Sequence, residues 1–472
     1  MRRMLSLFLL APLSPLSAAI IDVTSTSGAG SIQDAITQVN ALGGGPHTIR
    51  YAASFPSQTA VLLSAALPQI TASDVTIDGN GREPVIDGGG NFRIFQIGPN
   101  TTKLTLQRLT LRNGKASNGN GGCVDSTNVR TVAARLVVAA TRFENCKVTG
   151  TSLIYGGAIY WNATGTPVSI SDSVFIGNIA EATGSNGQTG GGAIYSNGVV
   201  SVLNSRFESN LALSNLGGGF GGAMFLGGAN ASHAIRDSNF IFNGASPASP
   251  IAGLGGAIYG GCDNCSVQVQ RSYFRGNSAN HGGAVYVRKP SAGDIDTYLT
   301  LTNVTLYNNS VVQRGGAVYL DRTGFTASNN TFYNGDATDG AHIYFGNNVN
   351  VDFFRGNLLA PAAFGSACAG TPTSLPSING GNLHFDSGCA SVAGTSIPNA
   401  PLGTITANQP ATGVGVLHFS GSAVIDSLDQ SLCEPRDARF QQRPIDGDGN
   451  GDARCDVGAY EFAPLLFKDS FE

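Results

Sequence analysis

The densest set of metal-binding side chains in this sequence lies between residues 446 and 456. Oxygen-bearing side chains alternate there with glycine, as in the first half of a calcium loop. The candidate ligands are Asp446, Asp448, Asn450, Asp452 and Asp456. An EF-hand loop needs a carboxylate at its twelfth position, which is Val457 here, so Asp456 or Glu461 would have to replace it. Two interpretations stay open, a structural calcium ion and a solvated acidic turn, and we favour the turn. No other cofactor is required.

Residues for bond cleavage are harder to find. Hydrolases and lyases of polysaccharides need convergent carboxylates with supporting basic groups, and we find no such set. His281 precedes Gly282 and Gly283, which suits a turn residue better than a catalyst. The charged stretch 288–296 has a solvated loop as its simplest explanation. An enzyme is therefore the alternative rather than the main hypothesis.

A five-residue phrase recurs through the middle of the chain, with two glycines, a small residue, an aliphatic residue and an aromatic residue. It begins at Gly156, Gly191, Gly221, Gly255, Gly282 and Gly315, and a degenerate copy begins at Gly340. A second phrase places an aromatic residue three positions before asparagine. Its copies are Phe175 with Asn178, Phe207 with Asn210, Phe240 with Asn243, Phe274 with Asn277 and Phe354 with Asn357.

The repeat length defines the architecture. Successive aromatic positions of the second phrase from Phe143 to Leu306 lie about 32 to 34 residues apart, which is one supersecondary unit. Between the phrases lie short β-branched or alternating runs such as 167–172 and 266–270, which predict strands closed by turns. Parallel coils stacked about 4.8 Å apart would place equivalent side chains over one another. The sequence therefore predicts an all-β fold, a right-handed single-stranded parallel β-helix with an N-terminal capping helix.

The aromatic residues of the glycine phrase form a candidate binding face. Strand alternation turns them outward if the preceding aliphatic residue points inward. The expected face consists of Tyr160, Tyr195, Phe225, Tyr259, Tyr286 and Tyr319, with Trp161 beside the first. Such a stripe suits sugar rings or a protein partner. The alternative, that loops of the longer repeats cover it, stays open.

Eight cysteines divide into four pairs of neighbours along the chain. The expected disulfides are Cys123 with Cys146, Cys262 with Cys265, Cys368 with Cys389 and Cys433 with Cys455. Cys262 and Cys265 also have the C-x-x-C spacing of redox and zinc sites. A disulfide is favoured, because no second C-x-x-C and no thioredoxin-like pattern accompany them.

The two interleaved phrases resemble the repeats of chlamydial polymorphic outer-membrane proteins and related bacterial β-helix surface proteins. The resemblance covers residues 121 to 357 and implies adhesion to host or neighbouring cells. A C-terminal membrane barrel, which self-anchoring members carry, has no matching strand pattern here. Motifs around Arg436, Arg443 and Glu461 resemble the choice-of-anchor Q region of exported β-helix proteins, which implies surface display.

The chain divides into five expected segments. Residues 1–19 resemble a signal peptide, with two arginines, an apolar run and small residues. Residues 20–75 form the cap and first strands, in which Ser31 begins a helix with Ile32, Ala35, Ile36 and Val39 on one face and Gly43 ends it. The other segments are 76–360 with the repeats, 361–462 with the anchor-like region and the tail 463–472.

Composition limits the function. With 27 Lys and Arg against 31 Asp and Glu, the net charge of -4 leaves no basic face for nucleic acid. No apolar run after the signal approaches a transmembrane length. We expect a secreted or surface-displayed, adhesin-like protein that binds a glycan or a protein. The alternatives are a polysaccharide lyase or glycoside hydrolase of the pectin-lyase-like fold, and a structural envelope component.

Overall fold

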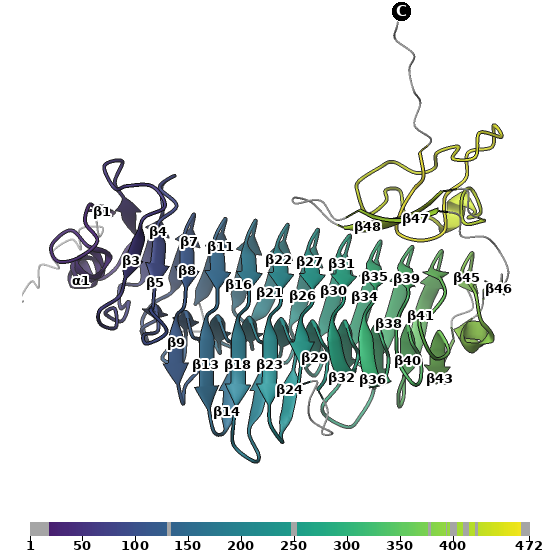
Figure 1. Cartoon of the computed structure of the whole chain (residues 1–472), viewed down its shortest axis with the longest axis horizontal. Helices are drawn as coiled ribbons and strands as arrows, with labels where there is room; N and C mark the ends of the chain where they lie inside the picture. The colour runs from purple at the N-terminus through teal and green to yellow at the C-terminus, as the bar shows by residue number, and fades with distance from the viewer. Residues whose placement is uncertain are drawn as a thin grey trace, which may run out of the picture.

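The protein is a parallel β-solenoid, whose long axis runs horizontally in Figure 1. The computed structural model describes residues 18–129, 134–246, 253–375, 379–392, 394–396, 404–408, 415–420 and 423–463. The expected signal segment up to residue 17 and the tail from residue 464 lie outside the described residues. Four parallel sheets, here numbered 1 to 4, run along the solenoid, which confirms the predicted all-β parallel fold. Between residues 103 and 321 each turn passes through sheets 1, 2, 3 and 4 in that order, whereas the later turns skip sheet 3.

Sheets 1 and 2 each contain thirteen strands within the described residues, all in parallel pairs. Sheet 1 contains β1 (Ala19–Val23), β2 (His47–Tyr51), β4 (Asp74–Asp78), β7 (Lys103–Gln107), β11 (Arg135–Ala139), β16 (Pro167–Ser171), β21 (Val199–Leu203), β26 (Ser232–Arg236), β30 (Ser266–Gln270), β34 (Tyr298–Thr302), β38 (Gly324–Ser328), β41 (Asn350–Arg355) and β44 (Asn379–Gly380). Sheet 2 contains β3 (Ala60–Leu62), β5 (Val85–Asp87), β8 (Thr110–Arg112), β12 (Arg142–Glu144), β17 (Val174–Ile176), β22 (Arg206–Glu208), β27 (Asn239–Ile241), β31 (Tyr273–Arg275), β35 (Thr305–Tyr307), β39 (Thr331–Tyr333), β42 (Leu358–Leu359), β45 (Leu383–His384) and β46 (Thr395–Ser396).

Sheets 3 and 4 complete the middle turns, and a short flap sheet branches off between them. Sheet 3 contains β9 (Lys115–Ser117), β13 (Lys147–Gly150), β18 (Ile179–Ala182), β23 (Leu211–Ser214), β28 (Gly244–Ala245), β32 (Ser278–His281) and β36 (Ser310–Arg314). Sheet 4 contains β6 (Phe95–Gln96), β10 (Val124–Asp125), β15 (Ile159–Trp161), β20 (Ile194–Ser196), β25 (Met224–Leu226), β29 (Ile258–Gly261), β33 (Val285–Arg288), β37 (Val318–Asp321), β40 (Ile343–Phe345) and β43 (Cys368–Gly370). The flap sheet contains β14 (Leu153–Tyr155), β19 (Gln188–Gly190) and β24 (Gly218–Phe220).

The predicted phenylalanine ladder fills the core behind sheet 2. Its five rings are those of Phe143, Phe175, Phe207, Phe240 and Phe274. Neighbouring centroids lie 4.6 to 4.8 Å apart with interplanar angles of 3°. Leu306 and Phe332 occupy the same position in the next two turns. Burial of each such ring contributes about 1.5 to 3 kcal/mol, so the ladder is a major source of stability.

The asparagines three residues beyond the rings form a second buried ladder. Asn178, Asn210, Asn243 and Asn277 each donate from Nδ2 to Oδ1 of the asparagine in the next turn, at 2.8 to 2.9 Å. Each also donates to the backbone oxygen of a phenylalanine in the preceding turn. Cys146 takes this position at the N-terminal end of the ladder, where its N–H donates to Asn178 Oδ1.

The pair Phe354 and Asn357 does not continue these ladders, so that part of the repeat prediction is wrong. Phe354 lies in β41 of sheet 1, and the Phe332 position is continued by Leu359. Asn357 stacks between Asn330 and Asn382 at the corner where sheet 1 meets sheet 2. Equivalent positions in successive turns are 32 or 34 residues apart along the earlier ladder but only 26 or 27 residues apart in this part of the chain. The phrase of an aromatic residue and an asparagine therefore no longer marks the corner after sheet 2.

The N-terminal end is closed by α1 (Ile32–Leu42), as predicted. Ser31 caps the helix by accepting the N–H of Asp34, and Gly43 ends it with φ of 65°. Ile32, Ala35, Ile36 and Val39 are buried in the main core beneath the helix. Because these apolar side chains cover the first coil, that end of the sheets is shielded from pairing with another chain.

The stack continues past residue 360 through β43 to β46, and the chain then folds back along the side of the rod (Figure 1). The short helix η1 (Ser387–Val392) lies between β45 and β46, and the folded-back segment contains the antiparallel strands β47 (Thr404–Asn408) and β48 (Val416–Ser420) and the short helix η2 (Gln430–Leu432). Glu434 pairs with Arg355 at 3.2 Å, and the N–H of Ala459 donates to Thr331 Oγ1 at 2.9 Å. The segment is therefore anchored on the outer side of the late turns.

All four predicted disulfides are formed, from Cys123–Cys146 to Cys433–Cys455. Cys123 occupies the alanine position of the glycine phrase and Cys146 the asparagine position of the other phrase. The Cα atoms at these two positions lie 5.6 Å apart, so the first bridge replaces a packing contact with a covalent bond. Within the described residues, no helix is long and apolar enough to cross a membrane.

His233 is expected to make the folded state less stable in acid. Its side chain is fully buried in β26 opposite Val267, and burial lowers its pKa to about 4. The folded state then binds fewer protons than the unfolded state, so this contribution is intact above pH 6.5 and is lost as the pH falls towards 4. We expect wild type to lose about 2 kcal/mol more than His233→Val between pH 7.5 and pH 5 in urea unfolding. Equal losses in the two proteins would contradict the assignment.

Candidate functional site

The outward aromatic residues of the glycine phrase form one continuous stack on sheet 4. The stack comprises Tyr160, Tyr195, Phe225, Tyr259, Tyr286, Tyr319 and Tyr344. Successive ring centroids lie 4.7 to 5.7 Å apart. We call this set the tyrosine stack. Sequence reasoning did not include Tyr344, although the degenerate glycine phrase at Gly340 contains it.

Trp161 does not lie beside Tyr160 on this face, so that expectation is wrong. It is 1% exposed and belongs to the main core, where its Nε1 donates to Thr166 Oγ1 at 2.9 Å. Strand alternation explains the placement, because Ile159 and Trp161 are two residues apart in β15 and point to the same inner side.

The tyrosine stack is covered along part of its length. Tyr160, Tyr259 and Tyr286 are 6 to 8% exposed, and Tyr155 of β14 and Phe220 of β24 pack against the stack from the flap sheet. Of the two interpretations that the sequence left open, the covered one therefore holds for these three rings. The rings of Tyr195, Phe225, Tyr319 and Tyr344 are half-buried.

Beyond the flap sheet, polar side chains border the stack. His281 lies edge-on to Tyr319 with centroids 5.3 Å apart, and the Arg314 guanidinium lies 5.0 Å from the centroid of Tyr344. Arg314 also pairs with Asp339 at 3.4 Å. Burial raises the pKa of Tyr195 to about 12 and also raises that of Tyr319, so both hydroxyls stay neutral near pH 7. This end of the stack thus presents the rings of Tyr319 and Tyr344 beside the ion pair of Arg314 and Asp339.

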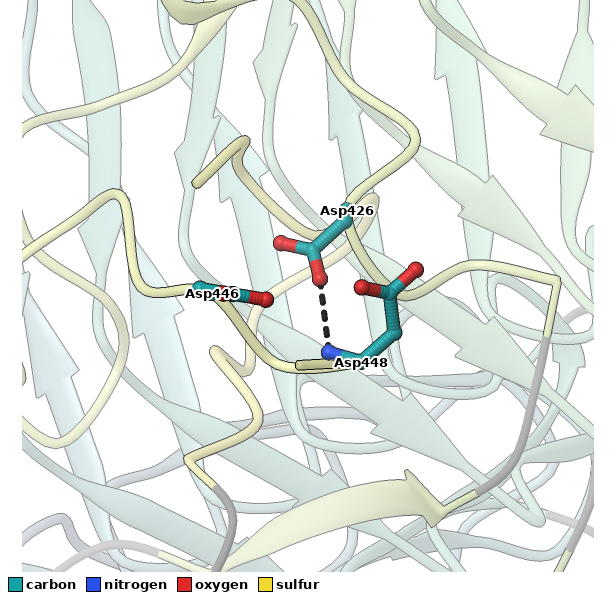
Figure 2. A group of neighbouring side chains, drawn as sticks. All are labelled: Asp426, Asp446 and Asp448. Atoms are coloured by element: carbon teal, nitrogen blue, oxygen red, sulfur yellow. Dashed lines mark hydrogen bonds between the residues drawn. The ribbon is translucent and has the colours of Figure 1, made fainter. Parts of the chain in front are cut away.

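The acidic loop brings two of its predicted residues together with one that sequence reasoning did not select. Figure 2 shows Asp446 and Asp448 facing Asp426, which comes from a separate segment. One oxygen from each carboxylate lies within 4.8 Å of the others. The link between Asp426 and the loop depends on tertiary folding, so no local spacing could have indicated it.

Backbone N–H groups already satisfy much of this carboxylate cluster. Asp426 Oδ2 accepts from Gly447 and Asp448 at 2.8 Å. Asp446 Oδ1 accepts from Gly449 at 2.7 Å and Asn450 at 3.1 Å. The remaining oxygen lone pairs can hold a cation, but the loop is also closed without one.

The other predicted ligands contact the residues of that cluster but have hydrogen-bond partners of their own. Asp456 accepts backbone N–H bonds from Asp426 and Phe462, and burial raises its pKa to about 7. Asn450 directs its amide nitrogen to Asp448 and its oxygen to the N–H of Asp452, which is exposed. Val457, at the twelfth position, is buried against the solenoid.

Calcium is tested by thermal unfolding of the full chain. Since backbone donors already occupy the carboxylates, we expect the Tm in 2 mM calcium to equal that in a calcium chelator within about 1 °C. A rise of several degrees that disappears in Asp426→Asn would contradict this expectation and assign a structural ion to the loop.

The anchor-like motifs converge in a buried charge network. Arg443 and Glu461 have fully buried side chains, and Arg443 Nε lies 3.2 Å from Glu461 Oε2. Asp437 Oδ2, also buried, accepts from Arg439 and from the N–H of Glu461. Breaking a buried ion pair leaves an uncompensated charge, so these motif residues hold the folded-back segment together.

Comparison of the chain with protein-family models, curated proteins and solved structures finds no match. The class of the protein is therefore given by its own geometry, a disulfide-bonded parallel β-solenoid with an external tyrosine stack.

Proposed function

We propose that this chain is an exported, adhesin-like surface protein that binds a glycan or a protein segment along the tyrosine stack. The stack itself carries the proposal. Stacked aromatic rings offer contact area at a small entropic cost, and the rigid strands beneath fix their spacing. Four of the seven rings remain half-exposed, and Tyr319 with Tyr344 lies where the flap sheet has ended.

Two further observations support an extracellular role. Four disulfides suit an oxidising compartment. The repeats resemble those of polymorphic outer-membrane proteins, and the folded-back segment resembles the choice-of-anchor Q region. On this proposal, the segment 361–462 positions the solenoid at the cell surface, and the N-terminal residues 1–19 direct export.

The proposal predicts that binding depends on the half-exposed rings. We expect the double substitution Tyr319→Ala with Tyr344→Ala to weaken binding of the chain to its glycan or protein ligand at least tenfold. The reason is that it removes both rings from the accessible end of the stack. Leu203→Ala is the control, since Leu203 is 46% exposed on sheet 1. Surface-immobilised glycan and protein arrays give the measurement. Retention unchanged by the double substitution would contradict the proposed face.

A polysaccharide lyase or hydrolase is the second candidate, favoured by one pocket of 290 Å³ across the corner between sheets 1 and 2. Glu83, Asp172, Arg108 and Arg142 line it. Glu83 accepts from Gln58 Nε2 at 3.0 Å, and Asp172 accepts from Asn204 Nδ2 at 2.7 Å, so each carboxylate has a structural partner.

One screen separates the two candidates. The full chain is incubated with acidic and neutral polysaccharides, with and without calcium. We expect retention without turnover. New reducing ends or unsaturated uronides that disappear in Glu83→Gln or Asp172→Asn would instead favour the enzyme.

A further inference from the structure

A second surface feature lies on sheet 1, away from the tyrosine stack. It is an open pocket of 310 Å³ at the point where β26, β30 and β34 begin. Its polar and aromatic lining comes from Asn230, Ser232, Asn264, Ser266, Asp296 and Tyr298. Three consecutive turns of the solenoid therefore contribute equivalent positions to one pocket.

Tyr298 supplies an exposed aromatic ring. Its side chain is 40% exposed, and it lies over Gly324 in the next strand. A Cβ atom at Gly324 would lie 2.3 Å from a carbon of this ring, so glycine is required for the ring to lie there. An exposed ring that lies flat over a glycine is suited to stacking against an apolar face of a ligand.

Asn230 and Asn264 supply polar groups from equivalent positions in two successive turns. Asn230 and Asn264 have φ of 60° and 52°, and Asn264 Nδ2 donates to Asn230 Oδ1 at 2.6 Å. In the described part of the chain, Asn230 Nδ2 has no hydrogen-bond acceptor and Asn264 Oδ1 has no hydrogen-bond donor. One amide donor and one amide acceptor thus remain for a ligand. The hydroxyls of Ser232 and Ser266 lie 2.9 Å apart beside them.

The C-x-x-C loop holds Asn264 in place. The buried disulfide between Cys262 and Cys265 closes a loop that contains Asn264, and the N–H of Asn264 donates to Asp296 Oδ1 at 3.0 Å. The motif that resembled a redox site thereby has a positioning role at a surface pocket.

The pocket carries no unpaired charge among its described lining residues. Asp296 is its charged member, and Asp296 Oδ2 accepts from Lys289 Nζ at 2.7 Å. Lys289 is 5% exposed and also donates to the backbone oxygen of Asp294. The neutral balance favours a ligand with hydroxyl groups over an anion.

We propose that this pocket binds one ring of a neutral saccharide. The apolar face of the sugar packs on Tyr298, while its hydroxyls accept from Asn230 Nδ2 and donate to Asn264 Oδ1. The volume is at the lower end of small-molecule pockets, which suits a single sugar ring. The site does not depend on the tyrosine stack.

Isothermal titration of the full chain tests the site, with cellohexaose, laminarihexaose, mannohexaose and hexagalacturonate as probes. We expect millimolar or tighter binding of at least one neutral probe, and weaker binding of hexagalacturonate. Tyr298→Ala and Asn264→Gly should each weaken the neutral probe at least tenfold. Glycine permits the positive φ of Asn264, so the second variant keeps the loop.

Two control variants separate this site from other effects. Tyr298→Phe should bind within about threefold of wild type, and Tyr319→Ala should bind as wild type does, which distinguishes the pocket from the tyrosine stack. The proposal is overturned if none of the neutral probes binds, if Tyr298→Ala retains binding, or if hexagalacturonate binds more tightly.

Discussion

Replacing Phe207 with alanine is expected to lower the free energy of unfolding by about 3 to 5 kcal/mol. The ring is fully buried between Phe175 and Phe240, with centroids 4.8 Å away on both sides. Because the backbone of the neighbouring turns is fixed by parallel ladders, the cavity cannot collapse fully, and stacking is lost on both ring faces.

Phe242 provides the matched control for this substitution. It lies two residues after Phe240 but is 51% exposed, so Phe242→Ala should change the free energy of unfolding by less than about 1 kcal/mol. Urea unfolding followed by far-ultraviolet circular dichroism gives both values. Equal small changes for the two phenylalanines would mean that the ladder is misassigned.

Replacing Asn210 with alanine is expected to lower the free energy of unfolding by about 3 to 5 kcal/mol. The side chain accepts from the N–H and Nδ2 of Asn178 and donates to Phe175 O and Asn243 Oδ1. Its removal leaves several buried groups without a partner, and each unsatisfied group costs about 1 to 3 kcal/mol. The loss should therefore exceed that of an ordinary hydrogen bond.

Asn162 is the control for the asparagine ladder. It is exposed, and its Oδ1 accepts one bond from Asn197 Nδ2 at 2.7 Å. Asn162→Ala should cost less than about 1 kcal/mol in the same urea assay. If Asn210→Ala proved as mild as Asn162→Ala, the ladder would not be a buried hydrogen-bond network.

The repeated core was predictable because each turn presents the same pattern. A ring that recurs every 32 to 34 residues, with asparagine three positions later, predicts both ladders. The helix signals from Ser31 to Gly43 and the neighbouring cysteine pairs were equally local. Such local patterns predict the structure correctly because the parallel stack places equivalent residues of successive turns over one another.

The candidate sites were predicted less completely, since they depend on contacts between distant segments. Strand alternation correctly turns Tyr160 away from Ile159, but covering by Tyr155 and Phe220 comes from flap strands whose sequences do not repeat. Likewise, Asp426 reaches the acidic loop through the folded-back segment. Trp161 could have been placed correctly by applying the same alternation one residue further.

The pocket at Tyr298 combines features that the sequence presents separately. The C-x-x-C loop, the charged stretch around Lys289 and the exposed Tyr298 come together because consecutive turns lie in register. None of the three alone indicates a ligand.

An experimental structure of the full chain, by crystallography at a resolution that shows side chains, tests the central claim most directly. We expect the rings of Phe143, Phe175, Phe207, Phe240 and Phe274 to lie parallel in one interior column, with Tyr286, Tyr319 and Tyr344 stacked on the outside. A density map that places those phenylalanines in separate cores, or facing solvent, would contradict both the solenoid and the binding face built on it.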